Sequence, residues 1–267
     1  MSGWDALRAE LAAWAEPATI WWRDDDAVSD TEALQRMRGI SRNLSASVAL
    51  AVIPAHADET LVTAVTDWPD ADICQHGYAH VNHAPTGVKK AELGDHRRID
   101  EVITQLREGR ERLRGLFGVR AAPVLVPPWN RIGAEVLARL SETGLRALST
   151  FKARTKAVDG SAEGARIGVV NTHVDIIDWR GTRGFVGESA ALSALVAHLH
   201  ARRTGTADAT EPTGILTHHL VHDEACWEFL SNFYAFAAGE SKLLHLRVSQ
   251  LPWAPRTQLT DHWTGHG

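Results

Sequence analysis

The sequence predicts an α/β barrel built from about seven strand–helix units. Short apolar or β-branched runs alternate along the chain with longer segments of helical period, an order typical of parallel strands joined by crossover helices. The chain has 267 residues, 44% hydrophobic and 23% charged, and can therefore bury one large core. Polar clusters also fall where the predicted strands end, which is where active-site groups gather in such barrels. We expect a single domain over residues 1–267, with its motif-bearing core at about 19–240.

Seven segments have the length and composition of buried strands. They are short, rich in β-branched or apolar residues, and each is followed by a helical pattern or a long loop. The predicted strands are 19–23, 47–53, 71–75, 123–126, 146–149, 167–173 and 214–218.

Five segments have helical periodicity: 31–44, 95–117, 134–143, 189–202 and 223–238. The clearest is 95–117, which places apolar residues on one face and Arg and Glu on the other, and Gly118 ends it. Gly144 follows the third segment, and Asp223 begins the last one at the positive end of its helix dipole. The N-terminal segment, 1–16, is amphipathic.

Composition excludes several classes of function. The formal net charge is −5 with both signs interspersed, so we expect no nucleic-acid partner. The chain lacks the features of a secretory signal and has no run of about 18 apolar residues, so we expect a cytoplasmic protein without a membrane partner. Cys74 and Cys226 are too few for a disulfide framework and are expected to be reduced, buried thiols.

Two polar clusters have the residue types of a metal site. Asp24, Asp25 and Asp26 follow the first predicted strand, and His76 and His80 follow the third. Two imidazoles and one carboxylate on rigid backbone leave positions free for water and substrate, an arrangement suited to hydrolysis. Taken alone, the aspartate triplet also fits a solvated turn or a helix cap.

With these residues the chain resembles the polysaccharide deacetylases of carbohydrate esterase family four, also called the NodB homology domain. The family has five ordered motifs, and each has a counterpart in family order across residues 19–219. The counterparts are Arg23-Asp24-Asp25-Asp26-Ala27, His76-Gly77-Tyr78-Ala79-His80, Val126-Pro127-Pro128-Trp129-Asn130, Asp175-Ile176-Ile177-Asp178-Trp179 and Leu216-Thr217-His218.

The resemblance implies a distorted (β/α)7-type barrel of the NodB-like, glycoside hydrolase/deacetylase type, and a role for each matched residue. Asp26, His76 and His80 would hold a divalent metal, expected to be zinc, with Asp25 as catalytic base and His218 as the acid that protonates the leaving amine. The residues expected to bind substrate are Trp129, Asn130 and Trp179.

For three of these roles, the sequence leaves a second residue possible. Asp24 competes with Asp25 as the base, because three consecutive carboxylates leave the register open by one residue. His219 competes with His218 in the same way, since adjacent strand residues face opposite sides. His83 is a weaker competitor of His80 as metal ligand.

The third motif departs from the family pattern. Its arginine, which in the family orients the catalytic aspartate, falls on Val126, whose apolar side chain cannot do so. Arg131 or Arg23 is expected to supply the missing cation, with Asp175 or Asp178 anchoring it in turn.

The sequence thus leaves three functions open. The first is metal-dependent hydrolysis of a non-peptide carbon–nitrogen bond, most simply de-N-acetylation of an amino sugar or a related small acetamide. The second is hydrolysis of another linear or cyclic amide. The third is a catalytically weak carbohydrate-binding protein. In each case we expect a small-molecule or soluble carbohydrate ligand.

Overall fold

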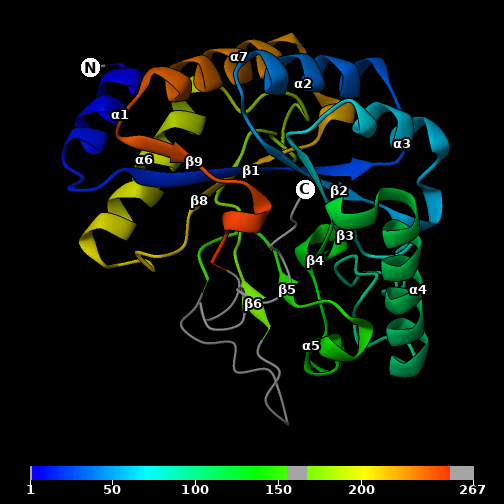
Figure 1. Ribbon diagram of the computed structural model, residues 1–267. Helices are drawn as coiled ribbons and strands as arrows, with labels where there is room; N and C mark the ends of the chain where they lie inside the picture. The colour runs from blue at the N-terminus through cyan, green and yellow to red at the C-terminus, as the bar shows by residue number, and fades with distance from the viewer. Residues whose placement is uncertain (1, 155–166, 253–267) are drawn as a thin grey trace.

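A curled, fully parallel sheet forms the centre of the molecule in the computed structural model, which describes residues 2–154 and 167–252 (Figure 1). Its strand order is β6-β5-β4-β3-β2-β1-β8-β7, and β9 pairs with the first residues of β1. The strands are β1 (Ala18–Ala27), β2 (Val48–Val52), β3 (Ala71–His76), β4 (Ala121–Val126), β5 (Ala147–Leu148), β6 (Gly168–Val169), β7 (Val174–Asp175), β8 (Thr213–Thr217) and β9 (Leu243–His245).

One short segment joins the two ends of this sheet. β6 pairs with β5, and β7, which follows it closely in the chain, pairs with β8. Between them, Thr172 bridges to Phe151 and His173 donates its backbone N–H to Gly214. The strand predicted at 167–173 therefore contains only β6, and β7 begins immediately after it at Val174. The expected distorted barrel is confirmed.

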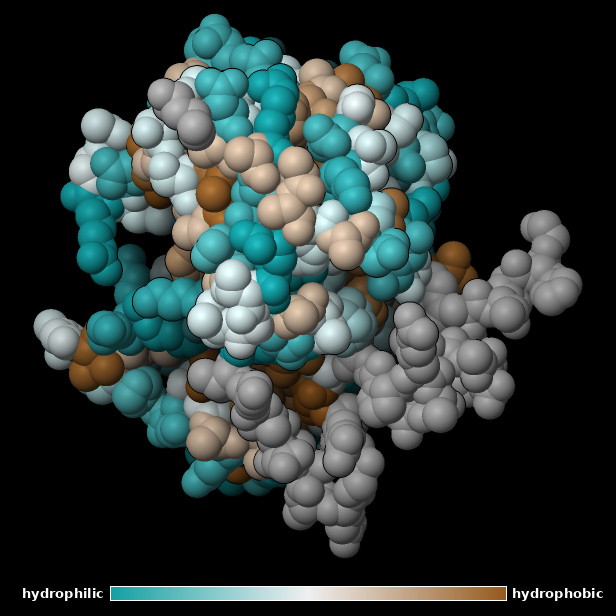
Figure 2. Space-filling view, turned by 90° about the vertical axis from the view of Figure 1, so that its left-hand side faces the viewer, coloured by the Kyte–Doolittle hydropathy of each residue, from teal (hydrophilic) through white to brown (hydrophobic). Residues whose placement is uncertain are grey.

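Helices cover the outside of the sheet (Figure 1). α1 packs on α6, α2 on α7, and α3 on α4. They are α1 (Gly3–Ala12), α2 (Glu32–Asn43), α3 (Glu59–Thr66), α4 (Ile99–Phe117), α5 (Ala134–Ala138), α6 (Glu188–Thr204) and α7 (Glu224–Gly239). Hydrophilic residues predominate on the side formed by α1 and α6, as expected for helices that bury their apolar faces (Figure 2).

The five predicted helices are present, and the sequence prediction missed α3 and β9. Asp58 caps α3 by accepting the N–H groups of Thr60 and Leu61, a local signal that the prediction overlooked. α4 begins at Ile99 rather than at 95, because the preceding chain is held by a bridge between Leu93 and Ile132. Within the described residues, no helix has both the length and the apolar character needed to cross a bilayer.

Alternation along the strands separates two parts of the core. Large side chains such as Trp22 and Leu50 belong to the cluster between sheet and helices. Small ones such as Ala49 and Cys74, together with Trp21, fill the inside of the curled sheet. Cys74 and Cys226 are buried free thiols, as predicted.

This alternation fixes where the polar end of β1 points. Arg23 and Asp25 are on the same face as Trp21 and so point into the barrel, whereas Asp24 is on the face of Trp22. The aspartate triplet lies within β1, which runs to Ala27, and not in a turn after it.

Candidate active site

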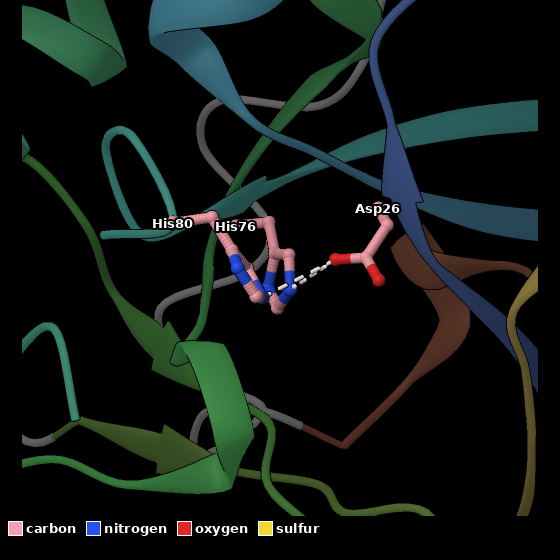
Figure 3. Close-up of side chains that lie close together, drawn as sticks. All are labelled: Asp26, His76 and His80. Carbon is pink, nitrogen blue, oxygen red and sulfur yellow. Dashed lines mark ion pairs between the residues drawn. The ribbon is translucent and has the colours of Figure 1, made fainter. Parts of the chain in front are cut away.

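Asp26, His76 and His80 meet at the carboxyl ends of β1 and β3 (Figure 3). Asp26 Oδ1 lies 3.1 Å from His76 Nε2 and 3.4 Å from His80 Nε2. One possible ligand atom from each residue lies within 4.8 Å of the other two. Fifty residues of chain separate Asp26 from His76, and the pairing of β1, β2 and β3 brings them together.

His76 is held in the tautomer that a metal ligand needs. It is the last residue of β3, and its Nδ1 lies 2.9 Å from the carbonyl oxygen of Val126 on the neighbouring strand β4. A carbonyl only accepts, so Nδ1 carries the proton and Nε2 keeps a lone pair that faces Asp26.

His80 is held by the loop that follows β3. Glu92 is buried and accepts the backbone N–H groups of Tyr78 and Ala79, at 3.2 and 2.7 Å. Gly77 adopts φ +57°, and a Cβ there would lie 1.9 Å from Glu92 Oε2. Only glycine fits this position, and the spacing between His76 and His80 depends on it.

Backbone strain collects in the same place. Asp26, His80, Trp129 and Asn130 all have positive φ, between 55° and 74°, and together they are four of the seven such non-glycine residues in the described chain. Positive φ costs a non-glycine residue free energy and persists where the surrounding structure enforces it, which is typical of functional sites.

Asp25 is paired with Arg23, two residues earlier on the same face of β1. Nε and one terminal nitrogen of the guanidinium lie 2.9 and 3.1 Å from the two carboxylate oxygens, and Arg23 is fully buried. The remaining donors reach Ser149 Oγ at 2.8 Å, the Thr150 carbonyl at 3.2 Å and Asn130 Oδ1 at 3.1 Å. A fork fixed at every donor orients the Asp25 carboxylate rigidly.

Arg23, rather than Arg131, is therefore the cation that holds the Asp25 carboxylate. Arg131 instead donates to the Lys90 carbonyl at 2.7 Å. The expectation that Arg131 orients Asp25 is wrong, because Arg131 binds the Lys90 backbone whereas Arg23 shares a strand face with Asp25 and binds it.

Asp24 faces the side of β1 opposite to Asp25, and its carboxylate already takes part in three hydrogen bonds. Its carboxylate accepts hydrogen bonds from Thr217 Oγ1 at 2.6 Å, from the His219 backbone N–H at 3.0 Å and from His219 Nδ1. The pair is buried, and the charge of His219 lowers the pKa of Asp24 even though burial alone raises it. This pair joins β1 to the end of β8.

His218 faces the site that His219 turns away from. His218 Nε2 lies 4.0 Å from Asp25 Oδ2, and its ring meets the Trp179 ring edge-on at a centroid distance of 4.7 Å. The sequence left Asp24 or Asp25 possible as the base and His218 or His219 possible as the acid. In the structure Asp25 and His218 face the metal-ligand group, whereas Asp24 and His219 bind each other. His83 is exposed and does not join the group, which contains His80.

The fourth motif positions an aromatic ring and a turn. Asp175 Oδ2 accepts the Trp179 Nε1–H at 2.8 Å, and burial raises the pKa of Asp175. Asp178 accepts the backbone N–H groups of residues 180–182 and so closes a tight turn. Neither carboxylate bonds Arg23, so the expectation that Asp175 or Asp178 anchors the orienting cation is wrong.

Trp129 and Asn130, the predicted substrate-binding residues of the third motif, lie beside His80 and Arg23 respectively. The Trp129 ring lies 4.4 Å from the His80 ring, centre to centre, and Trp179 is 39% exposed near His218. Two tryptophans thus flank the site. Asn130 accepts from Arg23 and belongs to the network that holds Asp25, a connection that the sequence did not indicate.

The electrostatics of the ligand group favour a cation. Burial raises the pKa of Asp26, but the close contact with His76 and the charges of three nearby histidines outweigh burial and hold this pKa well below its usual value. Burial lowers the pKa of His76, yet Asp26 and Asp25 raise it overall. The negative charge next to the imidazoles therefore favours a cation in this group.

These residues fit a tetrahedral divalent metal. Asp26 Oδ1 is a buried oxygen without a hydrogen-bond partner among the described residues. Ligands about 2 Å from a zinc ion lie about 3.3 Å apart at tetrahedral angles. The distances of 3.1 and 3.4 Å from Asp26 Oδ1 to the imidazole nitrogens match that separation.

A second cluster of metal-ligating side chains lies beside the amino end of β8 and is less suited to a metal. His173 Nε2 lies 3.4 Å from Glu211 Oε2, and the His198 ring stacks on His173 at 3.5 Å. His173 Nδ1, however, accepts the Gly214 backbone N–H at 2.9 Å. The neutral ring then carries its proton on Nε2, which leaves that nitrogen no lone pair for a cation.

Sequence reasoning missed two residues of the site. Glu92 and Ser149 stand alone in the sequence, without a motif or a spacing that marks them, and their roles follow from a loop and a short strand end that only the fold brings to β1 and β3.

No protein-family model and no curated protein matches the chain. Solved structures do. A family 4 carbohydrate esterase from Streptomyces lividans, in complex with acetate, is 15% identical with a TM-score of 0.56, over 86% of this chain and 93% of that one. The Bc1960 peptidoglycan N-acetylglucosamine deacetylase is 16% identical with a TM-score of 0.54, over 88% of both chains.

A third similar structure is a family 4 pseudoenzyme from Bacillus anthracis, 15% identical with a TM-score of 0.52, over 89% of this chain and 66% of that one. At such identities the likeness concerns the backbone and leaves the chemistry to the residues described above. Many of the structural neighbours are family 4 polysaccharide deacetylases, and the fold of this chain is the NodB-like fold that they share.

Proposed function

We propose that the protein is a metal-dependent hydrolase of a non-peptide carbon–nitrogen bond, acting as a de-N-acetylase of an amino sugar or a related small acetamide. One observation carries the proposal: Asp25, oriented by Arg23, lies beside the Asp26–His76–His80 group and 4.0 Å from His218. A base and an acid next to a metal-ligand group are the parts that amide hydrolysis requires. The catalytic domain would span residues 1–267.

Asp26, His76 and His80 would hold the metal, and zinc suits their nitrogen and oxygen donors. When bound there, such an ion polarises a carbonyl oxygen and acidifies water. Asp25 takes the proton of the attacking water at a carboxylate oxygen, and the two hydrogen bonds from Arg23 hold that carboxylate in one orientation.

His218 completes the reaction. Its ring is only 14% exposed and stands beside Asp25, so it can give a proton to the leaving nitrogen as the carbon–nitrogen bond breaks. The Trp179 ring fixes one side of the imidazole. Trp129 and Trp179 provide aromatic walls of the kind that pack against the apolar faces of sugar rings.

The same fold also occurs in a family 4 pseudoenzyme, and this observation favours a second candidate, a carbohydrate-binding protein with little turnover. The complete set of Asp25, Arg23 and His218 argues for the enzyme, because a binding protein needs no oriented base.

The test combines metal content with product release. Protein stripped with a chelator and reloaded with Zn²⁺ should bind about one ion per chain by elemental analysis and release acetate from N-acetylglucosamine or its short oligomers. Metal binding without acetate or any other amide product would favour the binding protein. A chain that binds no divalent metal would overturn the mechanism.

A further inference from the structure

A turn after β7 carries two arginines beside the site. Arg180 and Arg183 are both exposed, and the Arg183 guanidinium carbon lies 5.8 Å from the centre of the Trp179 ring. The same ring contacts His218 at 4.7 Å. The Trp179 ring thus contacts both the positive charge of Arg183 and His218, the residue proposed to protonate the leaving group.

The turn is built to hold its shape. Asp178 accepts three successive backbone N–H groups from residues 180–182, and its own N–H bonds the Gly184 carbonyl at 2.9 Å. A Cβ on Gly184 would lie 2.3 Å from Asp223 Oδ2, which also accepts the Phe185 N–H. Arg183 adopts φ 60°, a conformation that costs free energy and that the surrounding bonds enforce.

Trp129, the second tryptophan that flanks the site, also has a cation next to its ring. Lys90 Nζ lies 5.9 Å from the centre of the Trp129 ring, whose other neighbour is His80 at 4.4 Å. Arg131 fixes the Lys90 backbone by donating to its carbonyl at 2.7 Å. Both tryptophans that flank the site therefore carry an exposed cation next to them.

Nothing in the described parts of the chain neutralises these cations. Lys90, Arg180 and Arg183 form no ion pair and no side-chain hydrogen bond within residues 2–154 and 167–252. The neighbouring carboxylates are already occupied: Glu92 and Asp178 accept backbone N–H groups, and Asp175 accepts from Trp179. Unpaired cations on a preorganised turn and beside the tryptophan rings that flank the site are suited to an anion from outside the chain.

On these grounds, and resting on the proposed function, we infer that the substrate is an acetamide that carries an anionic group, a carboxylate or a phosphate, which Arg183 and Lys90 bind at the rim while the acetamide lies at the metal-ligand group. Phosphate and carboxylate are equally good acceptors for a guanidinium, and the test separates them.

The experiment compares three probes on Zn²⁺-loaded protein: N-acetylglucosamine, N-acetylglucosamine 6-phosphate and N-acetylmuramic acid. The inference expects kcat/KM for at least one anionic probe to exceed that for the neutral sugar by about tenfold or more. A preference confined to the phosphate probe or to the carboxylate probe identifies the group. Rising salt should reduce the preference. Equal kcat/KM for all three probes would overturn the inference and leave the proposed function standing.

Charge-removing variants locate the effect. Arg183→Gln and Lys90→Gln should each lower the ratio of anionic to neutral kcat/KM about tenfold or less, and the double variant should abolish the preference. The matched control is Arg42→Gln, an exposed arginine in the last turn of α2, next to the amino end of β2 and away from the site. A preference that survives the double variant contradicts the inference.

A binding measurement keeps the inference testable without turnover. If none of the three probes is hydrolysed, calorimetry on the Zn²⁺-loaded protein compares glucosamine 6-phosphate with glucosamine. Tighter binding of the phosphate that depends on Arg183 and Lys90 supports the anion site even where the proposed reaction fails. Equal binding of the two sugars overturns it.

Discussion

Arg23 and Asp25 form a two-pronged ion pair inside the barrel, with nitrogen–oxygen distances of 2.9 and 3.1 Å, from positions two apart on one strand. Residues two apart on a strand face the same side, so the pair is built into the covalent order of β1. The third motif can then carry an apolar residue, and Val126 is fully buried in the barrel interior.

The first prediction concerns this pair. Arg23→Lys keeps a positive charge but loses the planar fork, so Asp25 should be held loosely and kcat should fall on the order of 10–100-fold. Zinc content should stay near that of the wild type, because the ligands are untouched. Steady-state kinetics and elemental analysis check both parts. Unchanged kcat would show that Asp25 needs no fork.

The second prediction separates base from ligands. Asp25→Asn should retain the metal and lose hydrolysis by about 100-fold or more, because an amide cannot take the proton of water. His76→Ala should lose both. If Asp25→Asn stays active while Asp24→Asn is inactive yet still folded, the assignment of the base is wrong by one residue.

The third prediction assigns Asp24 to stability. Asp24 and His219 are buried against each other, so Asp24→Ala leaves an uncompensated buried histidine and should cost about 3 kcal/mol or more of unfolding free energy. Denaturant titration of Asp24→Ala and of an Asp25→Ala partner distinguishes a structural aspartate from a catalytic one. A small loss at Asp24 would contradict this role.

The sequence predicted most of the strands and the proximity of Asp26, His76 and His80, because these depend on local pattern or on family spacing. Periodicity within β1 also indicated that Arg23 and Asp25 share a face, although the prediction left Arg131 open beside Arg23. The roles of Glu92 and Ser149 could not be predicted from the sequence. A single carboxylate or hydroxyl forms no sequence motif, and these roles depend on contacts with distant parts of the chain.

The prediction at 167–173 shows the same limit. Apolar composition predicted one strand there, whereas the structure forms β6, which pairs with β5, and β7 just beyond the predicted range, which pairs with β8. The pairing of β6 with one end of the sheet and of β7 with the other end curls the sheet. This pairing depends on the positions of β5 and β8 in the fold, which local sequence does not indicate.

The fourth prediction concerns Gly77. Gly77→Ala places a methyl group against the Glu92 carboxylate and two Pro128 carbons, in a backbone conformation unfavourable for alanine. We expect about 1–3 kcal/mol of destabilisation and weaker zinc binding, because the loop that positions His80 must shift. Gly39→Ala, in α2 where nothing lies within 4 Å, is the matched control and should be neutral or slightly stabilising. Equal zinc affinity in the two variants would contradict the role of this loop.

The fifth prediction is acid sensitivity from the stacked imidazoles beside the amino end of β8. Burial, with the charges of His173 and Arg202, lowers the pKa of His198 to about 3, and burial lowers that of His173. The groups facing them include Glu211, Arg202 and Arg154. The unfolded chain protonates histidine near pH 6.5. Below that pH the unfolded state binds more protons than the folded state, so the free energy of unfolding falls as pH falls, down to the folded pKa.

His198→Phe keeps an aromatic ring for the stack and removes the titration. Between pH 6.5 and 4.5, chelator-treated wild type should therefore lose about 1–2 kcal/mol more unfolding free energy than this variant. Chelator treatment matters because it keeps metal release from the other end of the barrel out of the comparison. Urea titrations at the two pH values provide the measurement, and parallel losses in the two proteins would show that His198 takes up its proton at the same pH in the folded chain as in the unfolded chain.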